Sequence, residues 1–301
     1  RFAAERMLTA RSITRDVALV WLDEFEAQQR AATLRALLTQ MMAEREVSAA
    51  RVSAGRDRAT DVLALDSELS SSRDELILAE RDEGRARAAL SRWIGEAALR
   101  PLPARLAHEW TAPLDLASIA HSFDAHPALQ STERAIEAAL SDVDRARAER
   151  NPDWGWELMY GQRRDDRSDM VTFQVTVGLP WNRADRLDRR IATRLAEVSA
   201  LHSDLSDRHR MLEAELASIQ ADLTASVERL REHEGERIPT ARARLETAQA
   251  AYAGGSGCLM DVWRARRAWI ETNLHHDMIL AERGRALARH AWLTGQMEVL
   301  P

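Results

Sequence analysis

The longest helix-forming segment limits the fold of this chain more than any other feature. From Arg183 to about Tyr252 the sequence is rich in Ala, Leu, Arg and Glu and contains a single proline, Pro239. An α-helix rises about 1.5 Å per residue, so roughly seventy residues would extend about 105 Å. No compact globule holds such a helix. The sequence therefore predicts an elongated helical protein, kinked at Pro239 because proline lacks the amide hydrogen that the helix needs.

Other segments have the same helical character. Helices are predicted at residues 3–53, 58–94, 127–150 and 258–294, with a short one at 115–123. The breaks between them coincide with glycine or proline, which interrupt helices; they lie at Gly55, Gly95, Pro101, Pro103, Pro113, Asn151-Pro152 and Gly295.

The chain also repeats itself with an offset of 200 residues. Gly55 aligns with Gly255, and Asp61 aligns with Asp261. Further matches join Glu46 to Glu246, Ala50 to Ala250, Val62 to Val262, Arg85-Ala86 to Arg285-Ala286, and Gly95 to Gly295. The repeated unit is a long helix, a glycine turn and a shorter helix, and such internal duplication defines the architecture before any motif does. Position 1 aligns with position 201, so the first copy is expected to lack about 18 residues of helix and a preceding strand pair.

Two segments before the second copy change from helical to alternating periodicity. Apolar and polar or small residues alternate over residues 154–162 and again over 171–179, with a polar loop between. This pattern predicts a β-hairpin. It fits a membrane β-barrel, which would need further strands to close its edges, or a soluble hairpin with one face packed on the helices. The aromatic residues near the strand ends would form the membrane girdle of a barrel: Trp154, Trp156, Tyr160 and Trp181.

Composition excludes several classes of function. The formal net charge is -6, and all 42 basic residues are Arg, so no basic patch indicates nucleic acid. Cys258 is the single cysteine, which rules out an intrachain disulfide. No run of 18 apolar residues predicts a transmembrane helix. The chain opens within an amphipathic helical pattern and has no signal peptide, so we expect a fragment of a longer precursor.

No motif indicates catalysis or a cofactor. The nine histidines show none of the spacings of a zinc motif, and adjacent residues such as His275 and His276 point about 100° apart on a helix. The sequence also lacks a glycine-rich phosphate loop and a nucleophile–base pair. We therefore predict no metal site, no cofactor and no enzymatic activity.

Three strings resemble the TolC-like outer-membrane efflux proteins. They are HPALQSTERAIEAALSDVDRARAERNPDW, VTVGLPWNRADRLDRR and IPTARARLETAQAAYAGGSGCLMDVWRARRAWIETNL. The strand pair, NPDWGWELMYGQR followed by SDMVTFQVTVGLP, is most similar to the heavy-metal efflux branch of the CzcC and CusC kind. The chain departs from the family in lacking the N-terminal signal, the lipid-anchor cysteine, the first helices and the first strand pair.

The resemblance implies a mainly α fold. Long antiparallel helical hairpins of an α-barrel or coiled-coil type would carry one inserted antiparallel β-hairpin. The expected parts are an incomplete first-repeat hairpin, a linker with short helices, a β-barrel hairpin and a second-repeat hairpin, at residues 1–98, 99–150, 151–181 and 182–301.

The resemblance also implies a function. Three copies would form an outer-membrane barrel and a periplasmic helical tunnel in a Gram-negative bacterium. An inner-membrane pump of the resistance-nodulation-division (RND) class would drive export, and a periplasmic adaptor would join pump to channel. Heavy-metal cations are the expected cargo. The alternatives are a drug or small-molecule channel of the same family, or a soluble coiled-coil scaffold.

Site roles follow from the same resemblance. Asp261 would contribute to a ring of three carboxylates that selects cations, while Asp61, Thr60 and Tyr252 would lock the closed aperture. The family's lock arginine aligns with Gly257 and a second ring aspartate with Arg264, so the gate is expected to be held differently; Arg58 is a candidate substitute. The adaptor would contact the turns at Gly55, Gly255, Ser256 and Leu259, although plain helix capping is an alternative explanation of these residues.

Overall fold

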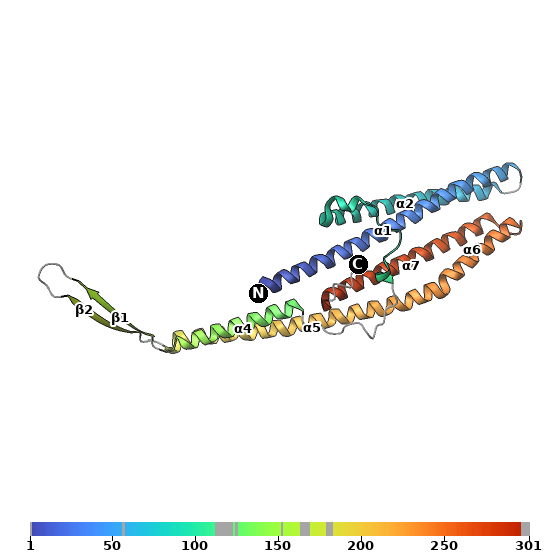
Figure 1. The fold of residues 1–301 in the computed structure, drawn as a ribbon. Coiled ribbons are helices and arrows are strands. Elements are labelled where there is room, and N and C mark those ends of the chain that lie inside the picture. The colour runs from blue at the N-terminus through green and yellow to red at the C-terminus, as the bar shows by residue number, and fades with distance from the viewer. Residues whose placement is uncertain are drawn as a thin grey trace. The chain divides into compact units, whose positions relative to one another are not determined.

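The structure is mainly helical and carries one two-stranded hairpin in its described part. This computed structural model describes residues 2–55, 58–111, 123, 126–151, 153–162, 169–178 and 183–295. The elements, in chain order, are α1 (Phe2–Ser53), α2 (Ala59–Ile94), η1 (Gly95–Leu99), α3 (His108–Thr111), α4 (Pro127–Ala148), β1 (Asp153–Gly161), β2 (Met170–Gly178), η2 (Arg183–Asp188), α5 (Arg189–Glu232), η3 (His233–Arg237), α6 (Ile238–Ala253) and α7 (Leu259–Thr294). The predicted fold class is confirmed (Figure 1). The short helix predicted at 115–123 lies outside the described residues, apart from Phe123.

The 200-residue repeat reappears in the element boundaries. Helix α1 ends at Ser53 and α6 at Ala253, and α2 and α7 occupy the same stretch of their copies. In the described part of the chain, positive φ angles occur at four glycines, which form two repeat-related pairs: Gly55 at 70° and Gly255 at 77°, and Gly95 at 61° and Gly295 at 84°. Side chains rarely adopt these angles, so glycine is required at both turns and both helix ends.

The helix from η2 to α6 continues past Pro239 through a π-helical turn, η3. The amide of Ile238 donates to the carbonyl of His233, five residues earlier. Such a widened turn accommodates a proline, which can neither donate to the preceding turn nor fit tightly against it. At the position of the predicted kink, the helix is therefore widened.

Contacts group the chain into two compact units, each described by itself. One comprises Arg1–Leu8 and Asp124–Glu213, and the other comprises Thr9–Phe123 and Ala214–Pro301. In the first unit, α4 begins at Pro127, where the ring of His126 accepts a hydrogen bond from the amide of Ala128. Glu149 and Asp188 form ion pairs that join the end of α4 to η2 and α5, with Arg190 at 2.8 Å and Arg150 at 2.9 Å.

The second unit contains two helical hairpins that lie side by side, with their glycine turns at the same end (Figure 1). An apolar cluster joins α1, α2 and α7 near these turns; it consists of Ala31, Leu34, Leu37, Met41, Leu65, Leu69, Leu76, Ala79, Leu259, Trp263 and Ile270. A second cluster, farther from the turns, joins α1 and α7 to α3; it includes Leu22, Phe25, Trp110 and Ala288. The core of this unit therefore lies where the two copies meet.

Candidate functional site

Each hairpin turn is built by backbone hydrogen bonds around a positive-φ glycine. Gly55 donates to the carbonyl of Val52 at 2.9 Å, and Gly255 donates to Tyr252 at 3.1 Å. In the second turn, the amides of Ser256 and Gly257 both donate to the carbonyl of Ala251, at 3.0 and 2.9 Å. These bonds satisfy a carbonyl that the end of α6 would otherwise leave unpaired.

Gly257 leaves no room for the arginine that the family resemblance would place there. A Cβ atom at this position would lie 2.8 Å from the amide nitrogen of Tyr252 and 2.9 Å from the carbonyl carbon of Ala251. Both neighbours are backbone atoms and cannot move aside as a side chain could. The turn itself therefore explains why residue 257 is glycine.

Tyr252 has a cationic partner that the sequence did not reveal. The guanidinium of Arg51, at the end of α1, lies 4.8 Å from the centre of the Tyr252 ring, within the range of a cation–π interaction. Arg51 is thus an arginine that contacts this tyrosine. The two residues are 201 positions apart, so only the packing of the two hairpins brings them together.

The two repeat-related aspartates lie in the first turns of α2 and α7. The backbone amide of Asp61 donates to Arg58 at 3.0 Å, and that of Asp261 donates to Cys258 at 3.1 Å. Thr60 precedes Asp61 and is exposed. Carboxylates are favoured there because the helix N-terminus carries partial positive charge.

Arg264 directly modifies the surroundings of Asp261. Its guanidinium lies 3.3 Å from the carboxylate, and both side chains are largely exposed, at 76% and 62%. The sequence placed a cation where the family resemblance expects a second carboxylate. The structure brings this cation and Asp261 into one ion pair, which reduces the negative potential that Asp261 presents to solvent.

Among the predicted contact residues, the two turns offer backbone and small side chains to solvent. Gly55, Gly255 and Ser256 are exposed. Leu259, by contrast, is only 5% exposed, because it packs in the apolar cluster between α1, α2 and α7. Its side chain supports the turn from inside and is not available on the surface for a partner.

Three arginines of α7 tie the second copy to the first. Arg266 pairs with Glu44 of α1, and Arg285 donates to Asp23 of α1 at 2.8 Å. Arg267 donates to Glu75 of α2 at 2.6 Å and also to Glu271 of its own helix. These pairs cross the seam between the copies and add geometric specificity to its apolar packing.

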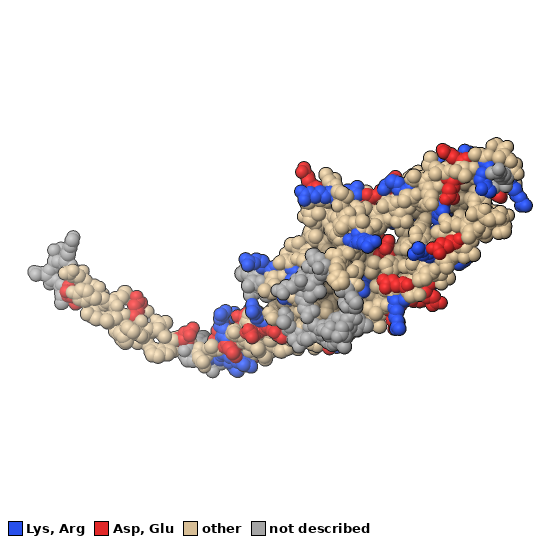
Figure 2. All heavy atoms as spheres, turned by 45° about the vertical axis from the view of Figure 1, so that its right-hand side comes forward, with Lys and Arg blue, Asp and Glu red and all other residues tan. Residues whose placement is uncertain are grey.

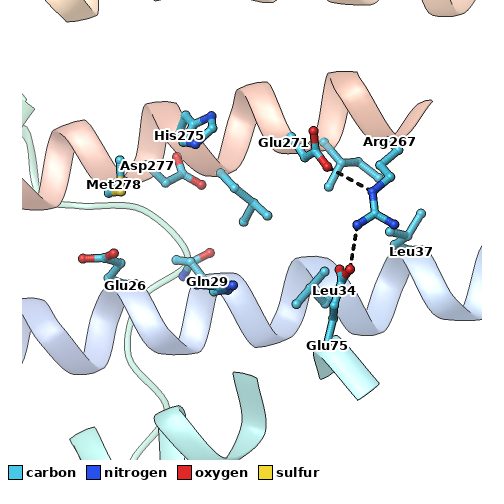
Figure 3. A pocket seen from close by; sticks show the side chains of 13 residues that line it. Glu26, Gln29, Leu34, Leu37, Glu75, Arg267, Glu271, His275, Asp277 and Met278 are labelled. Carbon is cyan, nitrogen blue, oxygen red and sulfur yellow. Dashed lines mark hydrogen bonds and ion pairs between the residues drawn. The ribbon is translucent and has the colours of Figure 1, made fainter. Parts of the chain in front are cut away.

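A cavity of about 470 Å³ lies in this seam (Figure 3). Leu34, Leu37, Ile270 and Leu274 form its apolar part, and the Arg267–Glu75–Glu271 group lies at one end. No group of three His, Cys, Asp or Glu residues in the described ranges is arranged to hold a metal ion. The cavity thus lies between amphipathic helices of the two copies.

The β-hairpin presents one apolar face that nothing in the described structure covers. Trp154 pairs with Val177, and the pairs Trp156–Val175, Leu158–Phe173 and Tyr160–Val171 follow along the same face. All eight side chains are more than half exposed, from 52% for Val177 to 73% for Trp154. The alternative of a hairpin packed on its own helices is therefore wrong. Trp181, the fourth predicted girdle residue, lies outside the described residues.

The opposite face of the hairpin is mostly polar or small. It carries Gly155, Glu157, Thr172, Gln174 and Thr176, and the methionines Met159 and Met170 lie at its loop end. In its described part the hairpin bears three acidic residues and no basic ones, whereas both charges are interspersed over the helices (Figure 2). Near the loop, the Tyr160 hydroxyl donates a hydrogen bond to Asp169. Alternation of an apolar and a polar face is the pattern of a strand pair with lipid on one side and water on the other.

None of the described helices is both long and apolar enough to cross a membrane. Long duplicated helical hairpins together with an exposed amphipathic strand pair are the parts of an outer-membrane channel protein. The family described as outer membrane efflux protein matches residues 121–295. The chain belongs to this family, whose members are transport channels rather than enzymes.

Solved structures support the fold. A membrane protein from Pseudomonas aeruginosa superposes with a TM-score of 0.79 at 18% identity, covering 97% of this chain and 70% of that one. The outer membrane protein VceC from Vibrio cholerae superposes with a TM-score of 0.78 at 18% identity, covering 97% of this chain and 72% of that one. CusC superposes with a TM-score of 0.77 at 15% identity, covering 97% of this chain and 70% of that one. A comparison with curated proteins found no match.

Proposed function

We propose that this chain is a subunit of a trimeric outer-membrane channel in a tripartite efflux system. An inner-membrane RND pump would supply the energy, and a periplasmic adaptor would join the pump to the channel. The observation that carries the proposal is the hairpin, whose eight apolar side chains share one exposed face over strands of nine residues each. Strands of about nine to eleven residues suffice to span a bilayer when tilted, provided that strands of other copies close the barrel.

In this assembly the two glycine turns form the periplasmic tip. Asp261 provides a ring of three carboxylates at the aperture, partly neutralised by Arg264. Thr60, Asp61 and Tyr252 belong to the lock, in which Arg51 supplies the cation at Tyr252. The exposed turn residues Gly55, Gly255 and Ser256 form the adaptor contact, and the aromatic residues of the hairpin form the membrane girdle. The four parts expected from the sequence remain the proposed domain division.

The proposed cargo is heavy-metal cations, supported by the resemblance of the strand pair to the metal branch of the family. Metal ions would pass through the tunnel as cargo and would be attracted at the aperture by carboxylates.

The test is a deletion strain complemented with the full-length gene. Loss of the channel should lower the concentration of divalent metal ions that the cells tolerate, and the wild-type gene should restore it. The full-length protein should fractionate with the outer membrane. A strain sensitive to drugs or dyes but not to metals would contradict the cargo and leave the channel assignment intact; a soluble protein would contradict the channel.

A further inference from the structure

The cavity in the seam between the two copies has two acidic ends and an apolar middle (Figure 3). At the first end, Glu75 of α2 and Glu271 of α7 flank Arg267. At the second end, Glu26 of α1 and Asp277 of α7 line the wall. The apolar middle consists of Leu34, Leu37, Ile270 and Leu274. Its volume of about 470 Å³ lies within the range of pockets that hold small molecules.

At the first end, three carboxylates share a single guanidinium. Arg267 lies 2.6 Å from Glu75 and 3.0 Å from Glu271. Glu68 of α2 lies 3.4 Å from the same side chain. One positive charge does not neutralise three negative ones, so this end attracts a further cation.

At the second end, the carboxylates also outnumber their cationic partners. Arg285 pairs with Glu26 and with a second carboxylate of α1. Asp277 lies 3.4 Å from His276, which is also 3.2 Å from Glu234. Each base is therefore shared by two acids, and this end attracts a cation as well.

The two acidic ends are too far apart to bind one metal ion together. Glu271 and Asp277 are six residues apart on α7, which corresponds to roughly 9 Å along the helix. Carboxylate oxygens lie within about 2.6 Å of a bound divalent cation, so a single ion cannot contact both ends. Two ammonium groups joined by an aliphatic chain can contact both, because the chain crosses the apolar middle.

We propose that the seam cavity binds an aliphatic diamine in its doubly protonated form. One ammonium group donates hydrogen bonds to Glu75 and Glu271, and the other donates to Glu26 and Asp277. The chain between them packs against the apolar middle and removes its surface from water. Because α1 and α2 belong to the first copy and α7 to the second, the ligand ties the two copies together. The cavity lies within one chain, so this inference does not depend on the proposed assembly or its cargo.

One cation at the cavity opposes such a ligand. Arg30 of α1 is exposed and lines the cavity one helical turn from Glu26. Its positive charge repels an ammonium group at the second end. Arg30→Ala should therefore strengthen the binding of a diamine, whereas the loss of a carboxylate at either end should weaken it.

Titration of the full-length protein in detergent with diaminooctane tests the site. Its nitrogens can lie up to about 11 Å apart, whereas those of diaminopropane reach only about 5 Å, since each carbon–carbon bond is about 1.5 Å long. Calorimetry should give one bound diaminooctane per chain. The melting temperature should rise with its concentration, because a ligand of the folded state stabilises that state.

Three probes are the controls for length and charge. Diaminopropane has both charges but is too short, octanediol has the length without the charge, and magnesium chloride supplies a divalent cation without a chain. Each should bind at least about tenfold more weakly than diaminooctane, because each loses a charged hydrogen bond at one end or both.

A matched pair of variants on α2 tests the first end. Glu75→Gln should weaken diaminooctane binding by at least about fivefold. Glu80→Gln is the control, because Glu80 also forms an ion pair with an arginine, Arg35 at 2.8 Å, but lies outside the lining of the cavity. It should bind diaminooctane as the wild type does. Asp277→Asn tests the second end and should weaken binding as Glu75→Gln does.

A substitution in the apolar middle tests the cavity without changing its charge. Leu274→Trp should fill the space and abolish binding, while its melting temperature without ligand shows that the protein is folded. Length-dependent binding that Glu75→Gln and Asp277→Asn weaken, and that Glu80→Gln leaves unchanged, supports the site. Equal binding of diaminooctane and diaminopropane, equal binding by the Glu75→Gln and Glu80→Gln variants, or binding by a folded Leu274→Trp variant overturns it. None of these results alters the channel assignment.

Discussion

At the residue scale, the duplication supplies matched controls for packing. Gly84 and Gly284 occupy the same position in the two copies, yet a Cβ would meet nothing within 4 Å at Gly84 and would lie 3.0 Å from the methyl carbons of Leu22 at Gly284. Leu22 is fully buried, so it has little freedom to move aside. One substitution can therefore report on helix propensity in one copy and on close packing in the other.

We expect Gly284→Ala to destabilise the protein by about 1–3 kcal/mol, the usual cost of overpacking a close-fitting site. Gly84→Ala should instead stabilise the monomeric chain by up to about 1 kcal/mol, because alanine has the higher helix propensity and restricts the unfolded chain. Chemical unfolding of the two variants in detergent, followed by circular dichroism, measures both. Equal effects at the two positions would contradict the packing of α1 against α7.

At the element scale, two histidines near η3 respond to pH in opposite directions. His276 lies 3.4 Å from Asp277 and 3.2 Å from Glu234, and these carboxylates raise its pKa despite partial burial. His233 is 6% exposed, and burial, followed by the nearby Arg237, lowers its pKa. Protonated His276 links α7 to Glu234 of η3, whereas the surroundings of His233 favour its neutral form.

The sign of the pH dependence follows. His276 contributes stability that is fully present below its unfolded pKa of 6.5 and is lost as the pH rises through its raised folded value. His276→Gln should therefore lower the melting temperature at about pH 6 but hardly at about pH 8.5. In that variant His233 remains, so stability should fall more steeply on acidification than in the wild type. Thermal melting over this pH range is the measurement, and a pH-independent difference would contradict the ion-pair role.

Hydrophobic periodicity and the positions of glycine and proline predicted most elements, because both signals are local. The sequence located both strands within one residue of their observed bounds. It located the glycine turns and the helix ends at Gly95 and Gly295 within a few residues. The π-helical turn was not foreseen, since a single inserted residue shifts the apolar pattern by one position and leaves its period unchanged. The short helix α3 lies in a proline-rich break that gave no periodic signal.

The candidate site was predictable only in part. Asp61 and Asp261 follow the turns by a fixed spacing, so the sequence located them. The contact of Arg51 with Tyr252, the burial of Leu259 and the backbone crowding at Gly257 all depend on how segments pack. No property of the sequence near these residues specifies those contacts.

At the scale of the whole molecule, the gate prediction concerns a pair of opposed charges. Asp261→Ala in the full-length channel should weaken cation selectivity and cation block in planar bilayers, since it removes the ring carboxylate. Arg264→Ala should have the reverse effect, because its guanidinium lies 3.3 Å from that carboxylate. Both effects should shrink as salt rises, since exposed charges are screened. Unchanged cation selectivity in both variants would contradict the placement of Asp261 at the aperture.

The membrane prediction uses two adjacent residues on opposite faces of β2. Val175 lies on the apolar face opposite Trp156, and Thr176 lies on the polar face opposite Gly155. If the apolar face meets lipid, Val175→Arg should cost about 2–4 kcal/mol near the middle of the bilayer, whereas an arginine on the lumen side is tolerated. We therefore expect Val175→Arg to deplete the full-length protein from the outer membrane and Thr176→Arg to leave it there. Immunoblots of separated membranes would measure both, and the reverse order would mean that the strands face lipid with their polar side.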